Sequence, residues 1–170
     1  MSLILETGAG LDNSNSYASV AFADDYLSLY SDKYTNWAEL SEAQREAYLL
    51  QGSQYIELKY NNRWKGKKAT STQALSFPRT QIYIDGYLVA HNIIPLAVRQ
   101  ATVEAALRAF EGDSLLGAEL EAGNIQSETV KVGTIESSIS YTGTKNRPNY
   151  PKINLLLTQL IRSNNQIYRG

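Results

Sequence analysis

The residues best suited to chemistry in this chain are basic, and they gather in one stretch. No acidic residue lies between Glu57 and Asp85, whereas the same stretch holds four candidate contact residues, Lys65, Lys67, Lys68 and Arg79. Ammonium and guanidinium groups neutralise phosphates, and the neighbouring Trp64 offers a ring on which a base can stack. The stretch is therefore a candidate contact for single-stranded nucleic acid.

The same residues support two other interpretations. In one, Trp64 and Phe77 are buried anchors and the lysines form a solvated face. In the other, the lysines line a wall that faces duplex DNA without gripping it. The sequence leaves the three interpretations open.

The segment that carries these charges is predicted to be an irregular loop pinned at both ends. Between Trp64 and Phe77 the sequence has neither a helical nor a strand period. Gly66 permits a turn that a Cβ would resist, and Pro78 fixes φ and favours an extended residue before it. Trp64, Gly66, Phe77 and Pro78 are therefore the candidate structural anchors.

Catalytic and metal-binding constellations are not evident. The chain has no cysteine and one histidine, His91, which argues against thiolate chemistry, a histidine metal cluster and a histidine-dependent triad. Asp24 and Asp25 are adjacent, so on a helix they diverge by about 100° and are expected to be solvated. The glycines match neither a dinucleotide fingerprint nor a phosphate loop. We expect a protein that is not an enzyme and holds no cofactor or metal.

The length and the net charge of the chain limit the number of domains and the kinds of partner to expect. A chain of 170 residues suits a single domain, here 1–170, and 16 basic against 17 acidic residues mean that any nucleic-acid contact is local. The N-terminal apolar run is too short for a signal peptide, and no run is long enough to span a bilayer. We expect no membrane partner and synthesis in a cytoplasm-like compartment.

The predicted fold is mainly α. It is a small bundle of about four helices with one or two β-hairpin excursions and extended termini. Ser19 caps a helix to about Ser31, and Ser41 with Gln44 forms a capping box for a helix to about Lys59. Prolines open two more helices, over 96–111 and from residue 151. Hairpins are expected around Asp85-Gly86 and Gly133-Thr134, whereas Trp37 is placed in a loop.

Two of these helices carry further predictions. The helix over 41–59 is apolar on three sides, one of them formed by Ala43, Ala47, Leu50 and Leu58, so it is either the central core helix or shared between core and subunit interface. In the helix over 96–111, Glu104 and Arg108 are expected to form an exposed pair.

Both ends of the chain are predicted to lack a packed partner within it. Residues 1–18 are rich in turn formers and are interpreted as an extended arm. Residues 163–170 form a flexible tail whose Ile167, Tyr168 and Arg169 make a small amphipathic hook. Such a tail is expected to order only on a partner, because two apolar side chains cannot offset its ordering cost.

Taken in order, these elements resemble one family over nearly the full chain. The resemblance rests on Asn15-Ser16-Tyr17-x-Ser19-Val20, Leu50, Tyr55-Ile56, Trp64-x-Gly66, Gln73-Ala74-Leu75-Ser76-Phe77-Pro78-Arg79, Ile94-Pro95, Ser127-Glu128-x-Val130-x-Val132-Gly133 and Tyr150-Pro151. These residues are similar to those of tailed-bacteriophage proteins often labelled "DnaT-like ssDNA-binding protein". The family's usual tryptophan before Pro-Arg is Phe77 here, which keeps an aromatic anchor without an indole N–H.

The resemblance implies a head-to-tail connector, or adaptor, in the virion neck. Such a protein, made in the host cytoplasm, forms a ring, commonly dodecameric, between the portal protein and a tail-completion or neck protein. The ring extends the channel for genomic double-stranded DNA. The resemblance also implies that Ile167, Tyr168 and Arg169 contact the portal. The family label implies the alternative, a single-stranded DNA-binding protein with a DnaT-like replication role.

Overall fold

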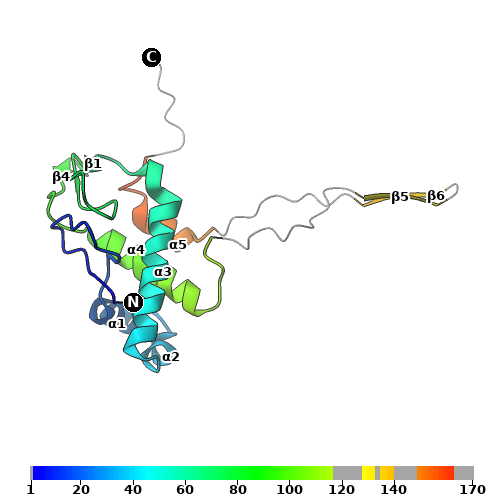
Figure 1. The fold of residues 1–170 in the computed structure, drawn as a ribbon, viewed down its shortest axis with the longest axis horizontal. Coiled ribbons are helices and arrows are strands. Elements are labelled where there is room, and N and C mark those ends of the chain that lie inside the picture. Colours follow the sequence, from blue (N-terminus) through cyan, green and yellow to red (C-terminus); the bar gives the residue numbers. More distant parts are fainter. Residues whose placement is uncertain (1, 117–127, 133–134, 140–148, 163–170) are drawn as a thin grey trace, which may run out of the picture. The chain divides into compact units, whose positions relative to one another are not determined.

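The computed structural model describes residues 2–116, 128–132, 135–139 and 149–162. The chain divides into two compact units. The first comprises Met1–Asp113 with Tyr150–Gly170, and the second is Ser114–Asn149. The described helices all belong to the first unit, and the second contains a two-stranded ribbon (Figure 1).

The mainly helical class is confirmed. The α-helices in the described residues are α1 (Val20–Tyr30), α2 (Tyr34–Ala38), α3 (Glu42–Tyr60), α4 (Leu96–Phe110) and α5 (Pro151–Leu157), and a short 3-10 helix, η1 (Asn61–Arg63), follows α3. Helix α2 was not predicted, because the sequence pattern placed Trp37 in a loop. Five residues are too few to show a helical period, so this turn depends on burial of Trp37 against the core.

The helix starts follow their predicted caps. Ser19 Oγ accepts a hydrogen bond from the Phe22 N–H at 3.2 Å, and Ser41 and Gln44 form the reciprocal capping box of α3. Pro151 is the first residue of α5. The apolar stripe of α5 runs past the helix, because Ile161 is buried in extended backbone paired antiparallel with Trp64.

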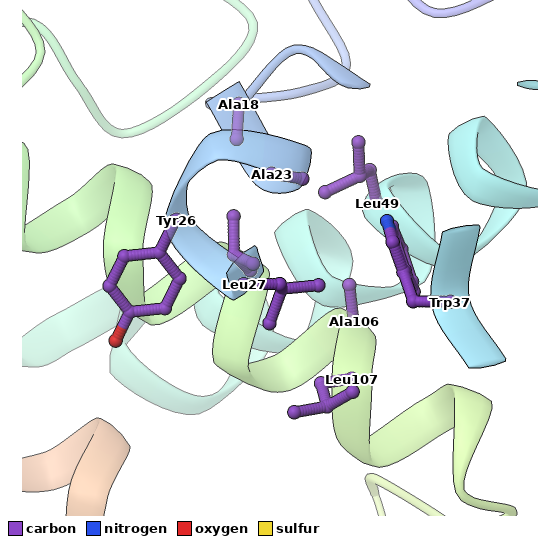
Figure 2. Close-up of a cluster of buried hydrophobic side chains, with 9 residues drawn as sticks. Ala18, Ala23, Tyr26, Leu27, Trp37, Leu49, Ala106 and Leu107 are labelled. Atoms are coloured by element: carbon purple, nitrogen blue, oxygen red, sulfur yellow. The ribbon is translucent and has the colours of Figure 1, made fainter. Parts of the chain in front are cut away.

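A buried apolar cluster joins α1, α2, α3 and α4. Nine buried residues form it, namely Ala18, Ala23, Tyr26, Leu27, Trp37, Leu49, Val103, Ala106 and Leu107, most of which are labelled in Figure 2. Helices α3 and α4 cross closely, since a Cβ on Gly52 would lie 2.5 Å from the Thr102 carbonyl oxygen. The absence of a side chain at Gly52 therefore lets the two helix backbones approach closely.

Of the three apolar sides of α3, the single chain buries two. Leu49, Tyr55 and Ile56 are buried, whereas Ala43 and Ala47 are exposed and Leu58 is 56 % exposed. Helix α3 is thus a core helix that leaves one apolar side facing outward.

Three antiparallel two-stranded sheets complete the described chain. Strand β1 (Lys67–Lys68) pairs with β2 (Arg79–Thr80), β3 (Tyr83–Ile84) with β4 (Tyr87–Leu88), and β5 (Glu128–Val132) with β6 (Ile135–Ile139). Both predicted hairpins are present. Asp85 and Gly86 have φ values of 50° and 85°, the left-handed pair of a two-residue turn. Strand β1 lies inside the stretch predicted to be irregular, and β2 begins just after it.

The predicted N-terminal arm is not extended. Leu5 forms a parallel bridge with Ser16, and the buried Glu6 carboxylate gathers the turn between them. It accepts hydrogen bonds from the N–H groups of Gly8, Gly10 and Leu11 at 2.8, 3.0 and 2.9 Å and from Ser14 Oγ at 3.0 Å. The turn-forming residues that argued against a helix here build a compact loop around a single carboxylate.

Two predictions about charged side chains are wrong. Glu104 is only 3 % exposed, accepts a hydrogen bond from the Tyr26 hydroxyl at 2.8 Å and pairs with Lys152 of α5, whereas Arg108 pairs with Glu111. Asp24 is not simply solvated, because it accepts from Trp37 Nε1 at 2.8 Å and from Arg45 at 2.6 Å. Both errors have the same cause, because helical spacing does not reveal which side chains of other helices lie close to a residue.

Candidate nucleic-acid and assembly surface

The basic stretch begins where α3 ends, and its two aromatic residues belong to the interior. Trp64 is 2 % exposed and Phe77 is 1 % exposed. Their ring centroids lie 4.9 Å apart at 88°, and Tyr60 and Tyr17 extend the cluster on either side, with centroids 5.7 Å from Trp64 and 6.3 Å from Phe77. Edge-to-face contacts of this kind hold the two ends of the loop together. In this conformation Trp64 offers no face to a nucleic-acid base.

Gly66 is required by its surroundings. Its φ of +66° is unfavourable for other residues, and an added Cβ would lie 2.1 Å from the Thr80 carbonyl oxygen. Pro78 follows a cis peptide bond with Phe77 and is itself buried. Gly66 comes directly before β1, and Pro78 comes directly before β2.

Arg79 ties this loop together from within. Its guanidinium donates three hydrogen bonds to backbone carbonyls, from Nε to Lys65 at 2.8 Å, from Nη2 to Gly66 at 2.9 Å and from Nη1 to Ser76 at 3.2 Å. The side chain is half-buried, and burial lowers the pKa of its guanidinium from the ordinary value. A planar fork suits several carbonyls at once, so Arg79 acts here as an internal brace.

Gln73 is a second brace, which sequence reasoning did not single out as a site residue. Its Nε2 donates to the carbonyls of Leu75 and Pro78 at 2.8 and 3.0 Å, and its Oε1 accepts from the Thr70 N–H at 2.9 Å. A side-chain amide satisfies both donors and acceptors in a tight loop. The one feature of the sequence that could have pointed to Gln73 is its position at the start of the Gln-x-Leu-x-Phe-Pro-Arg block.

Glu57 joins the loop to α3 and to the N-terminal segment. Its carboxylate accepts from the Ser76 N–H at 3.0 Å, from Ser76 Oγ at 2.8 Å and from the Tyr17 hydroxyl. The Tyr17 hydroxyl in turn accepts from the Phe77 N–H at 3.1 Å. Burial, with a further contribution from Glu57, raises the pKa of Tyr17 well above its ordinary value. No local pattern in the sequence relates these distant residues.

The lysines face outward. Lys67 and Lys68 are exposed on β1 and Lys65 is half-buried. Lys65 Nζ donates to the Gln159 carbonyl at 2.9 Å and Lys68 Nζ to that of Gln73 at 3.2 Å. Such contacts at the surface leave ammonium groups open to solvent and to an anion. The structure therefore separates the four predicted basic residues into three surface lysines and one internal arginine.

Exposed aromatic rings follow immediately in the chain. Tyr83 and Tyr87 of the β3–β4 hairpin are 59 % and 81 % exposed, and Leu88 beside them is exposed as well. Strand β2 leads directly into this hairpin, and both lie near the C-terminal end of α3 (Figure 1). The available rings are thus these tyrosines rather than Trp64.

Other kinds of site are not apparent in the described part of the chain. It contains no cluster of three or more histidine, cysteine or acidic residues able to hold a metal ion. None of its helices is long and apolar enough to cross a membrane. The predicted portal-contact residues Ile167, Tyr168 and Arg169 lie outside the described residues.

The chain as a whole also matches a known sequence family. The model of the family described as "Putative DnaT-like ssDNA binding protein" matches residues 1–170. The chain belongs to this family. Comparisons with curated proteins and with solved structures found no match. In this DnaT-like protein Phe77 of the Gln-x-Leu-x-Phe-Pro-Arg block is buried and Arg79 is half-buried, whereas Lys67 and Lys68 of β1 are exposed.

Proposed function

We propose that the protein is a structural subunit of a phage virion, a head-to-tail adaptor that assembles into a ring between portal and tail. The observation that carries the proposal is the number of elements on which a single chain leaves large apolar side chains exposed. These side chains are Leu29 and Tyr30 of α1, Leu58 of α3, Tyr83, Tyr87 and Leu88 of the hairpin, Leu96 of α4 and Leu155 of α5.

A ring subunit needs this kind of surface. Its contacts are heterologous, so each copy presents one surface to the neighbour on one side and a different surface to the other, with further surfaces for the proteins above and below. Scattered single apolar residues need no explanation, but exposed tyrosines and leucines on several elements fit multiple contacts. The open side of α3, marked by Leu58, is the part of this surface that the sequence already suggested.

The lysines have a role in this proposal as well. Lys65, Lys67 and Lys68 would face the channel or a neighbouring subunit, where positive charge favours the presence of DNA without sequence contacts. A near-neutral chain with one basic surface suits a passage for duplex DNA, which must slide. Wild-type protein is therefore expected to bind oligonucleotides weakly.

The experiment that tests the adaptor role is electron microscopy of the protein mixed with its portal. We expect ring density attached to the portal. The Leu58→Glu variant, which places a charge on the open side of α3, should lose the ring, whereas Thr35→Glu, an exposed change on α2, should retain it. A persistent absence of ring or portal-bound density with the wild-type protein would refute the proposal.

The second candidate is single-stranded DNA binding, which the family description favours. Buried Trp64 removes the stacking platform that the sequence suggested, so the contact would rest on Lys67 and Lys68 with the exposed Tyr87. The test is a salt titration with a labelled oligonucleotide. This candidate requires tight binding that weakens steeply with salt and with Lys67→Ala/Lys68→Ala. No binding at low ionic strength would exclude it.

A further inference from the structure

Helices α1, α2 and α3 meet at an acidic end of the helical unit. The Asp24 carboxylate of α1 accepts hydrogen bonds from Trp37 of α2 at 2.8 Å and from Arg45 of α3 at 2.6 Å, which joins the three helices. Segment 24–46 holds six acidic and two basic residues, a net charge of −4. Its exposed acidic residues are Asp25, Asp32, Glu39 and Glu42. The N-terminal end of α3 is therefore a negatively charged surface.

The opposite end of α3 is basic. Segment 58–84 holds six basic residues and no acidic residue, a net charge of +6, and its Lys67 and Lys68 are exposed on β1. Arg162 adds an exposed cation from the C-terminal segment, since its N–H donates to the Arg63 carbonyl at 2.7 Å. Figure 1 shows α1 and α2 at one end of α3 and β1 near the other.

The two ends are too far apart to neutralise each other within one copy. Helix α3 has 19 residues, so at 1.5 Å per residue its ends lie about 28 Å apart. The Debye length at physiological ionic strength is about 8 Å. The helix macrodipole accounts only for Glu42 in the first turn and Lys59 in the last, because its effect falls off within one turn. The other charges form two separate fields of opposite sign, which attract a complementary surface.

Each end also exposes large apolar side chains. At the acidic end Leu29 and Tyr30 of α1 are 75 % and 64 % exposed, and at the basic end the β3–β4 hairpin exposes Tyr83, Tyr87 and Leu88. Exposed ion pairs alone contribute little to the stability of a contact. Apolar side chains supply the buried surface that a lasting contact needs, whereas the charges determine its orientation and its partner.

A second copy of the chain carries the surface that each end requires. We propose that the acidic end of one copy, formed by α1, α2 and the start of α3, docks on the basic end of a second copy, formed by β1 and the end of α3. The contact is heterologous, so each copy keeps one free end of each kind for a further neighbour. Within the proposed adaptor role, on which this contact rests, the surface lysines then face the neighbouring subunit rather than the channel.

Carbodiimide cross-linking at high protein concentration tests this contact, because it joins a carboxylate directly to an amine that touches it. Links from Lys67 or Lys68 to the exposed carboxylates of the acidic end cannot form within one copy, since α3 holds the two ends about 28 Å apart. Mass spectrometry of an equal mixture of isotope-labelled and unlabelled protein identifies the copy from which each linked peptide comes. We expect these links between copies, at a yield that falls several-fold at high ionic strength.

Charge variants provide a second measurement, sedimentation velocity at low ionic strength. Lys67→Glu/Lys68→Glu should lower self-association several-fold, because most of the positive charge of the basic end is then cancelled. Asp25→Lys/Glu39→Lys, which cancels the negative charge of the acidic end, should have the same effect. Lys67→Arg/Lys68→Arg is the matched control, since it keeps the positive charge and should associate as the wild-type protein does. Far-UV circular dichroism checks that all variants are folded.

Three results would overturn the proposal. The first is a yield of links between the two ends that is no higher at low than at high ionic strength. The second is a Lys67→Glu/Lys68→Glu variant that associates like the wild-type protein. The third is binding of labelled duplex DNA, lost in that variant, without any links between copies, which would make nucleic acid the occupant of the basic end.

Failure of this contact and failure of the adaptor role are distinguishable. Ring density on the portal with Lys67→Glu/Lys68→Glu would remove the contact and leave the adaptor role intact. Absence of ring density with the wild-type protein would instead refute the adaptor role, whatever the cross-links show.

Discussion

Replacement of Arg79 tests whether this residue is a brace or a ligand contact. In Arg79→Ala the carbonyls of Lys65, Gly66 and Ser76 all lose their donor. A hydrogen bond from a charged donor contributes about 1.5–3 kcal/mol net. Because the side chain is half-buried, water replaces part of this loss, and we expect the free energy of unfolding to fall by about 2–4 kcal/mol in total.

The assay is urea unfolding followed by circular dichroism and by tryptophan fluorescence, with the slope of the transition compared among variants. Arg79→Lys should recover only part of the loss, since one ammonium group cannot reach three carbonyls in the geometry of the guanidinium fork. Lys67→Ala is the matched control, an exposed basic residue of the same loop, and its effect should stay within about 0.5 kcal/mol.

The result that would refute this reasoning is an Arg79→Ala variant as stable as Lys67→Ala. If that variant were instead stable but defective in oligonucleotide binding, Arg79 would be a ligand contact and its hydrogen bonds in the free protein would be replaceable by water.

Three further outcomes are expected. Gly66→Ala should lower the free energy of unfolding by about 2 kcal/mol or more in urea unfolding. Gly86 also has a positive φ but has open space around it, so Gly86→Ala should lower the free energy of unfolding by only about 1 kcal/mol. Equal losses in the two variants would contradict the steric argument. Burial raises the pKa of Tyr60 to about 12, so the folded state holds the hydroxyl proton more tightly than the unfolded chain does. The stability that this protonated hydroxyl contributes is present below about pH 10 and is lost as pH rises through the folded pKa. The urea midpoint of Tyr60→Phe should therefore fall less steeply at alkaline pH than that of the wild-type protein. Deletion of residues 164–170 should leave the melting temperature nearly unchanged and abolish docking to the portal, which co-sedimentation with portal-bearing heads would measure; undiminished attachment would place the docking surface on the helices.

Features specified by neighbouring residues were predictable from the sequence. The Ser41–Gln44 capping box, the Asp85-Gly86 turn and the proline that opens α5 each act within a few residues, and each lies where it was expected. The basic stretch was found for the same reason, since charge along a chain is visible without a fold.

Features that depend on distant contacts were missed. The Glu6 carboxylate needs a turn to wrap around it, and Arg79 is an internal brace because carbonyls of the residues just before β1 lie within its reach. The Trp64 ring is interior because it packs against Phe77 and Tyr60, although its sequence neighbours are the basic residues Arg63 and Lys65. Local composition describes what a residue can do, and packing determines whether it is available.

The ion pair of the buried Glu104 carboxylate with Lys152, whose side chain is half exposed, has a consequence for the order in which the chain folds. Helices α1, α3 and α4 precede α5, and the whole 114–149 unit is synthesised before α5 emerges. Until then Glu104 has the Tyr26 hydroxyl as a partner but not its cation, and a buried carboxylate without a cation is strongly unfavourable. We therefore expect the nascent helices to remain loosely associated around Glu104. We expect the core to close when Lys152 arrives together with the buried Ile153 and Leu157, so that docking of α5 completes the fold of a newly made chain.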